Sequence, residues 1–407
     1  MAEIITSKNR YYNEAKLILL NFLVLSLVGT LLRYLQINGL VQINYKNLLE
    51  AHSHFAFSGV LLLSCITALC LSFEELAYYI NPGIFKIFLA ESYLLLIIFT
   101  IFGYKAPGII ASTLYLFTTY YLVYLIWQGS KKINDQIVAL ILRYAAFFFM
   151  FSTLALWCMG PLMALKFAGK PIYYNTVYFY LHFQYNGFFT FSVLALLVQY
   201  LSKKKLVHDS DLNSNYIHLL AFATLLSYFI STLWCNPNFI IRLLAFSGAF
   251  FQAYVFIKLY FTFKKLVSNQ IKFSFLIKFI LVACGIKILL MLIISIPFIS
   301  FNSISNRHTI IGFLHLTFIG TLWLSYWYCI QNHVLQNQFT NGKKMFVFLL
   351  FYILSEILLF SSAVKLPFLS AVWNQLLIYF SGGMSLGILL ILIFSVFMKS
   401  KESIGNK

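Results

Sequence analysis

The chain has 407 residues, of which 61% are hydrophobic and only 10% are charged. Because soluble domains carry about 25% charged residues, this composition excludes a soluble globular protein and indicates an integral membrane protein. The net charge of +18 does not indicate a nucleic-acid partner, since the basic side chains are spread over short connections between apolar segments.

Apolar segments of about 20 residues, each long enough to cross a bilayer as a helix, follow one another along the whole chain. We therefore predict an all-α membrane protein with twelve transmembrane helices, forming a single integral membrane domain over residues 1–407. The first segment lacks a small-residue cleavage site, so we interpret it as a span rather than a signal peptide. In chain order the predicted spans are 17–37, 49–72, 86–103, 108–128, 137–160, 176–200, 216–234, 239–262, 273–297, 309–331, 345–362 and 372–397.

The lysines gather in every second connection, and both termini are basic as well. This bias predicts that these connections and both termini are cytoplasmic, in a multi-pass protein of the inner (cell) membrane. The lysines in question are Lys131, Lys132, Lys203, Lys204, Lys205, Lys264, Lys265, Lys272, Lys343 and Lys344.

Three histidines inside predicted spans begin the same short motif. The motif is HFAFSG from His54, HFQYNG from His182 and HLTFIG from His315. Each copy lies in the second span of a group of four, which predicts a threefold repeat with copies at about 1–128, 129–262 and 263–407. In the predicted topology all three histidines lie about 8–9 Å below the outer boundary of the membrane.

Ionisable side chains inside a membrane mark functional sites by default. A neutral imidazole can ligate iron, copper or zinc. The aromatic residue three positions after each histidine is placed to flank a flat ligand. The glycine five positions after each histidine lets another helix approach closely. The alternative is that each histidine forms a hydrogen bond across helices and binds nothing.

These motifs give the chain a resemblance to subunit I of the haem–copper oxidases and nitric-oxide reductases. The resemblance implies twelve helices in three pseudo-symmetric four-helix arcs, with metal ligands on helices 2, 6, 7 and 10. It implies that His54 and His315 ligate haem b and that His182 has a copper or distal-pocket role. HFQYNG looks like the helix-6 copper motif His-x-x-x-Glu-Gly of nitric-oxide reductases, with Asn186 at the glutamate position. The chain is also similar to NnrS, a shorter haem-and-copper membrane family.

The sequence departs from this family at the copper site. Helix 7 offers only His218, near its cytoplasmic end, where the family has adjacent histidines. A His-x-His pair occurs on helix 2, as His52 and His54, rather than on helix 10. We therefore expect an incomplete copper site and little or no oxygen reduction.

Several other residues are candidates for the site. His52 points about 200° away from His54 on a helix, so it is either a ligand to a second metal or an interfacial polar residue. Arg33, Arg242 and Arg307 lie near outer helix ends, where they either bind haem propionates or extend to the interface. Three charged residues lie deeper in the predicted spans, where they either belong to a proton path or form ion pairs. These residues are Glu91, Lys287 and Glu356.

The expected function is that of a membrane haem protein in electron transfer or in oxygen or nitric-oxide handling, with a redox partner protein. Whether it is an oxidoreductase stays open. The alternatives are a secondary transporter, which twelve spans also suit, and a structural membrane subunit without a cofactor. The six cysteines form no CxxC pair and are interpreted as buried small residues.

Overall fold

The computed structural model describes residues 2–39, 42–206, 212–267, 274–296, 306–334, 345–362 and 372–405. Throughout these ranges every regular element is a helix, which confirms the predicted all-α membrane class. Within these described ranges, eleven helical segments are long and apolar enough to cross a membrane. The predicted span 345–362 corresponds to α16 (Phe346–Ser361), an apolar helix of 16 residues, shorter than the ~20 residues that a bilayer crossing needs.

The described contacts divide the chain into two compact units. Unit 1 contains residues 1–71, 81–119 and 326–407, and unit 2 contains residues 72–80 and 120–325. Besides α16, the elements that lie mainly in unit 1 are α1 (Ala2–Asn38), α2 (Tyr45–Phe55), η1 (Ala56–Leu62), α3 (Leu63–Ser72), α5 (Pro82–Phe102), α6 (Ala106–Ser130), α15 (Leu324–Val334) and α17 (Trp373–Gly405).

Unit 2 holds the middle of the chain. Its elements are α4 (Glu74–Tyr79), α7 (Gln136–Ala164), α8 (Pro171–His182), η2 (Phe183–Phe189), α9 (Thr190–Lys203), α10 (Ser214–Ser227), η4 (Tyr228–Cys235), α11 (Phe239–Val267), α12 (Phe275–Ser295), α14 (Arg307–His315) and η5 (Leu316–Trp323). Here α7 packs against α8, η2 and α9, while α10 packs against α11. Gly187 of η2 makes the contact between α7 and η2 close, because a Cβ built on it would lie 2.5 Å from Cβ of Phe148 in α7.

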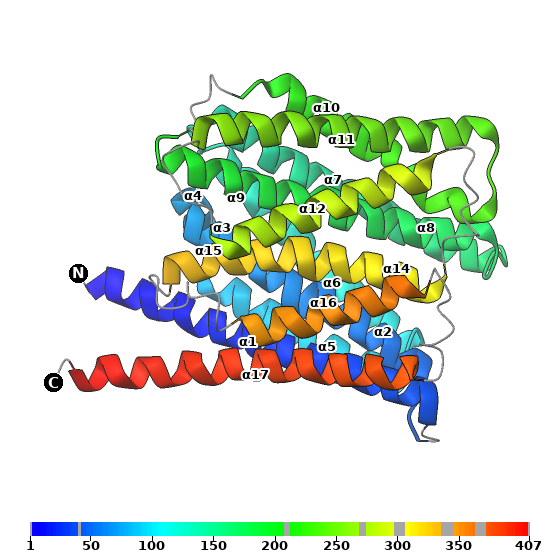
Figure 1. Cartoon of the computed structure of the whole chain (residues 1–407), viewed down its shortest axis with the longest axis horizontal. Helices are drawn as coiled ribbons and strands as arrows, with labels where there is room; N and C mark the ends of the chain where they lie inside the picture. The colour runs from blue at the N-terminus through cyan, green and yellow to red at the C-terminus, as the bar shows by residue number, and fades with distance from the viewer. Residues whose placement is uncertain are drawn as a thin grey trace. The chain divides into compact units, whose positions relative to one another are not determined.

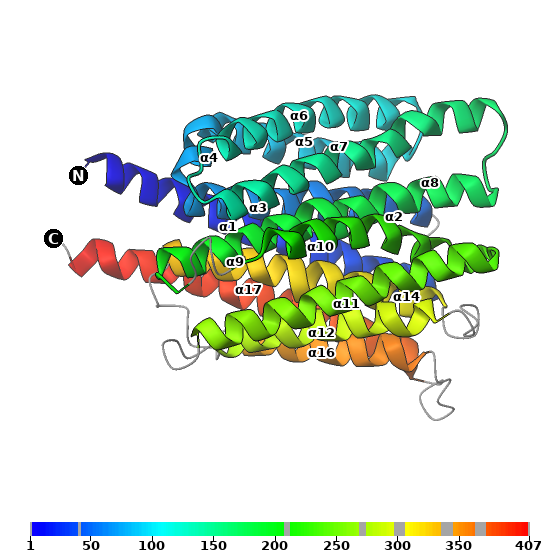
Figure 2. The ribbon, with the colours of Figure 1, turned by 90° about the horizontal axis from the view of Figure 1, so that it is seen from above.

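The first and last helices of unit 1 lie side by side (Figure 1). The hydroxyl of Tyr12, near the start of α1, donates to the carbonyl of Ser395, near the end of α17. The two chain ends therefore lie at the same end of this helix pair, as Figure 2 also shows. This arrangement agrees with an even number of crossings between the termini.

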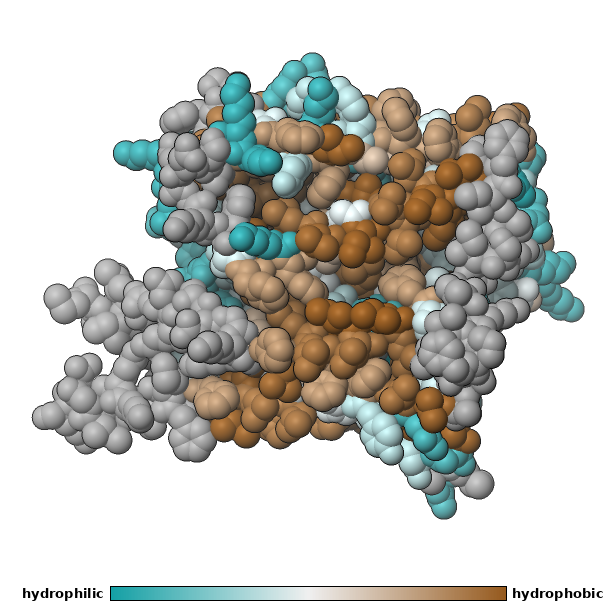
Figure 3. Space-filling model, in the orientation of Figure 1, coloured by the Kyte–Doolittle hydropathy of each residue, from teal (hydrophilic) through white to brown (hydrophobic). Residues whose placement is uncertain are grey.

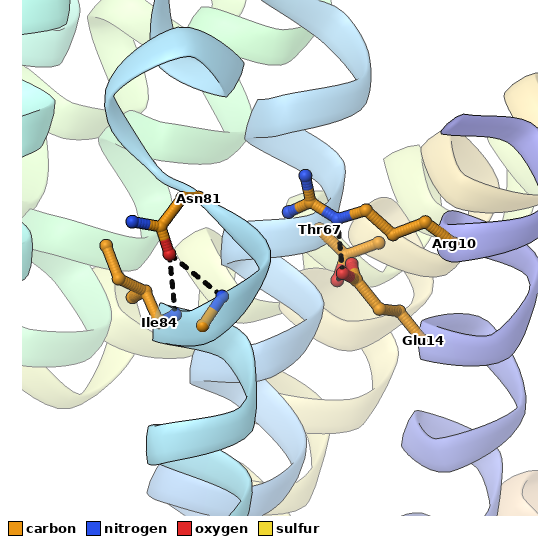
Figure 4. Close-up of polar contacts among 6 residues, drawn as sticks. Arg10, Glu14, Thr67, Asn81 and Ile84 are labelled. Atoms are coloured by element: carbon orange, nitrogen blue, oxygen red, sulfur yellow. Dashed lines mark hydrogen bonds and ion pairs between the residues drawn. The ribbon is translucent and has the colours of Figure 1, made fainter. Parts of the chain in front are cut away.

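Polar side chains also hold helix ends in place within unit 1. Glu14 is 5% exposed, pairs with Arg10 at 2.8 Å and accepts a hydrogen bond from Thr67 of α3 at 3.0 Å. Asn81 caps α5, because its Oδ1 accepts from the amides of Gly83 and Ile84 (Figure 4). Such caps satisfy amides that a helix start leaves without partners.

Apolar side chains cover the middle of the helices on the face drawn in Figure 3, and hydrophilic residues lie mainly toward the helix ends. In unit 2, α12 exposes Val282, Ile286 and Leu289 in this way. A surface of this kind suits contact with lipid chains. The chain is accordingly a multi-pass membrane protein. Of the lysines behind the predicted orientation, Lys272, Lys343 and Lys344 lie outside the described residues.

The predicted orientation can be tested at the C-terminus. A reporter that is active only in the periplasm, fused after Lys407, is expected to give no signal, because the lysine bias places that end in the cytoplasm. The same reporter fused within the connection around Lys105 should be active. Strong activity at Lys407 and none at Lys105 would reverse the topology.

Candidate functional site

Each of the three histidine motifs contains a π-helical turn. η1 begins two residues after His54, and η2 and η5 each begin one residue after His182 and His315. Well under 1% of residues in proteins are π-helical, and such turns concentrate at functional sites. The three turns thus occupy nearly the same position relative to the three histidines.

Side chains bond the backbone carbonyls that the wider π-turns leave accessible. Nδ2 of Asn21, a fully buried residue of α1, donates to the carbonyl of Gly59 at 2.7 Å, and its Oδ1 accepts from the Tyr93 hydroxyl at 2.9 Å. In the second copy the Thr190 hydroxyl donates to the carbonyl of Tyr185 at 2.6 Å. The turns are thus stabilised by groups both inside and outside their own helix.

His54 lies at the end of α2 within unit 1 and is partly buried. Its Nε2 is 2.8 Å from the Tyr104 hydroxyl, and its ring stacks on Phe99 with the ring centroids 4.0 Å apart. Both partners come from the end of α5 and the connection that follows it. Ligation of a metal through Nε2 would require Tyr104 to turn away, which exchanges one hydrogen bond for one metal bond.

His182 is 1% exposed and has a partner on each ring nitrogen. Its Nε2 donates to the carbonyl of Thr224 at 2.9 Å, and its Nδ1 accepts from Nδ2 of Asn186 at 3.1 Å. Ser227 lies 3.4 Å from Nε2 and itself accepts from Gln252 of α11 at 2.9 Å. Because both nitrogens are satisfied inside unit 2, this arrangement does not fit a copper ligand. It corresponds to the alternative in which the histidine forms hydrogen bonds across helices.

A stability measurement tests this reading of His182. Replacing it by alanine leaves the buried Asn186 amide without this acceptor and leaves the Thr224 carbonyl with only the weaker hydrogen bond from the Ser227 hydroxyl at 3.2 Å. We therefore expect the free energy of unfolding to fall by about 1–3 kcal/mol. Thermal unfolding of the detergent-solubilised protein measures the change. His218→Ala is the control, because the hydrogen bond between His218 and Tyr144 is exposed. An unfolding midpoint that is the same for His182→Ala and wild type would show that the network adds nothing to stability.

His315 ends α14 and is partly buried. The aromatic residue three positions after His315, Phe318, packs edge-on against the equivalent residue of the second copy, Tyr185, with ring centroids 5.6 Å apart. Within unit 2 the two copies therefore meet through equivalent side chains. One residue before Phe318, the hydroxyl of Thr317 is buried and has no hydrogen-bond partner among the described residues. Such a buried hydroxyl is compatible with a missing group beside η5.

The remaining candidates are distributed over both units. His52 packs over Gly29 of α1, where a built Cβ would lie 3.2 Å from its Cε1 atom. Arg33 has an electrostatic interaction with Glu356 of α16, so a carboxylate of the chain itself is near it. Arg242 donates through Nε to the carbonyl of Pro237 at 3.2 Å, close to the start of its own helix. Arg307 is exposed in the first turn of α14.

The deep charged residues interact with different groups, each within its own unit. Glu91 of α5 accepts a hydrogen bond from Thr118 of α6 at 2.6 Å, and Glu356 interacts with Arg33; all four belong to unit 1. Lys287 belongs to unit 2. In the described part of the chain, no group of three or more His, Cys, Asp or Glu side chains could hold a metal ion. Ligation of one haem by His54 and His315, which belong to different units, stays a prediction.

Sequence reasoning missed most of the partners described above. Tyr104, Thr224 and Gln252 belong to no motif, and only their positions in the fold connect them to the histidines. Asn21 gives a weak signal, since an amide inside an apolar span needs a partner. No family model matches the sequence, and no curated protein matches it.

Proposed function

We propose that this chain is an integral membrane haem protein of the haem–copper oxidase subunit I type, with twelve spans in three four-helix arcs and cytoplasmic termini. One observation carries the proposal: a π-helical turn follows each of the three matched histidines. A π-turn re-aims the side chains that follow it. A shared function explains a π-helical turn at three equivalent places better than helix packing alone does.

In this proposal His54 and His315 would hold haem b, which would supply one-electron redox chemistry when bound. Phe99 and Tyr104 position the His54 ring, and Nε2 of His54 would be available to the haem only without its hydrogen bond to the Tyr104 hydroxyl. Arg307, Arg33 and Arg242 are the candidate partners of the propionates. Of these, Arg33 interacts with Glu356, and Arg242 bonds the Pro237 carbonyl. The buried hydroxyl of Thr317 is available to a polar group of the cofactor.

The function that follows is electron transfer, or handling of oxygen or nitric oxide, in exchange with a redox partner protein. No copper-dependent step is assigned, because His182 uses both ring nitrogens within the protein and His52 packs against Gly29. Oxygen reduction at ordinary oxidase rates is therefore not part of the proposal.

A visible spectrum tests this directly. The protein purified in detergent from haem-supplemented cells is expected to show low-spin b-type bands on reduction with dithionite, with about one haem per chain by pyridine haemochrome. Metal analysis should find iron and no stoichiometric copper. Folded protein that lacks a Soret band would refute the proposal.

A further inference from the structure

Lys287 lies near the middle of α12, a candidate membrane span, and its side chain is only 7% exposed. Its Nζ lies over the ring of Tyr185, 5.9 Å from the ring centroid. Among the described residues this amine has no hydrogen bond and no carboxylate within 4.0 Å. A buried ammonium group without an anion is unfavourable inside a membrane, and such a residue marks a functional site by default.

The sequence offers Lys287 no carboxylate within the spans of unit 2. Residues 136–325 contain two acidic residues, Asp209 and Asp211, and both belong to the connection between α9 and α10. The other acids of unit 2 are Glu74, Glu75 and Asp135, which stand at helix starts rather than in mid-span. When Lys287 is protonated, its positive charge therefore has no balancing carboxylate in the spans of this unit. An anion from elsewhere is needed to balance it.

Two residues with hydroxyl groups lie on elements beside Lys287. Tyr185 of η2, under the amine, is 7% exposed, and its hydroxyl lies close to the side chain of Ser231 of η4. α12 packs against both η4 and η5, so the 3₁₀ turn that carries Ser231 lies against the helix that carries Lys287. The other titratable groups close enough to interact with Lys287 are Cys284 and His182. Neither supplies a negative charge, because an imidazole is neutral or positive and an unactivated thiol is protonated at neutral pH.

We propose that Lys287, with the hydroxyls of Tyr185 and Ser231, binds one small monovalent anion inside the membrane. The ammonium group supplies the single positive charge, and the two hydroxyls supply further donors from neighbouring helices. Only a small anion suits a site in which Lys287 and Tyr185 are each 7% exposed. This site is independent of the haem proposal, because none of its three residues is an assigned haem ligand.

The test uses the full-length protein in detergent and follows its thermal unfolding by light scattering. Sodium formate, sodium nitrite and sodium chloride serve as probes, each compared at equal ionic strength with sodium gluconate, whose anion is too large for the site. At least one probe is expected to raise the unfolding midpoint of the wild type in a saturable way, because binding to the folded state stabilises it.

Lys287→Met is expected to weaken the apparent affinity for that probe by about 30-fold or more, because a buried charge is lost. Tyr185→Phe keeps the ring beneath the amine and removes one hydroxyl, so it should weaken binding to a smaller extent. Lys258→Met is the matched control. Lys258 also lies over a tyrosine ring, Tyr254, at 5.5 Å, but it is exposed on α11. This control should bind the probe like the wild type.

Two results would overturn the proposal. One is a wild type that none of the three probes stabilises beyond gluconate. The other is equal, saturable stabilisation of the wild type and Lys287→Met. Because haem content is read separately from the Soret band, loss of anion binding with retained haem, or the reverse, distinguishes failure of this site from failure of the proposed function.

Discussion

Replacing His54 or His315 by alanine is expected to abolish the low-spin haem spectrum. Each substitution would leave the iron with at most one histidine ligand, so the dithionite-reduced protein should lose its low-spin bands or its haem altogether. The measurement is the reduced-minus-oxidised spectrum, normalised to folded protein by size-exclusion chromatography. Normalisation is needed because a partly buried histidine also contributes to helix packing.

The structure provides matched controls for this experiment. Tyr104→Phe removes the hydroxyl that bonds Nε2 of His54 and leaves the histidine in place, so haem should bind at least as well as in the wild type. His52→Ala and His182→Ala should keep the bands, because neither residue is assigned to the haem. Loss of the bands in His52→Ala but not in His54→Ala would exchange the two helix-2 assignments. Unchanged spectra in both His54→Ala and His315→Ala would refute the ligation model.

Gly248→Ala is expected to cause the largest loss of stability. A Cβ at this position of α11 would lie 2.3 Å from the Ser227 nitrogen and 2.6 Å from the carbonyl carbon of Leu226. These are backbone atoms of α10 and cannot move aside without separating the helices. We expect the free energy of unfolding to fall by about 3 kcal/mol or more. The displaced helix also carries Thr224 and Ser227, so the hydrogen bonds to His182 should break with it.

Gly285→Ala is the control for that substitution. Gly285 also belongs to an apolar membrane helix, α12, but a Cβ built on it meets nothing within 4 Å. Its unfolding midpoint should stay near that of the wild type or rise slightly, since alanine favours helix over glycine. Fluorescence-detected size exclusion after graded heating compares the two variants. Equal midpoints for Gly248→Ala and Gly285→Ala would contradict the close helix contact.

The sequence by itself determined the class of the protein and the approximate helix bounds. The predicted span 86–103 corresponds to α5 (Pro82–Phe102), and 216–234 corresponds to the segment 214–235 that α10 and η4 form. Such predictions succeed because the length and hydrophobicity of a span are properties of the segment alone. The sequence also showed the three matched histidines, because equal spacing is visible without any structure.

Only the tertiary structure decided what surrounds those histidines. The partner of His182 on Nε2 lies 42 residues away along the chain, and the partner of His54 lies 50 residues away. The π-turn after His54 is bonded by Asn21 from another helix, so its own sequence does not reveal it. A hydrogen bond depends on the position and direction of two groups that packing brings together. For that reason the sequence identified which residues to examine, while the packing of helices determined that both ring nitrogens of His182 have partners. It also determined that, among the described residues, no carboxylate pairs with Lys287.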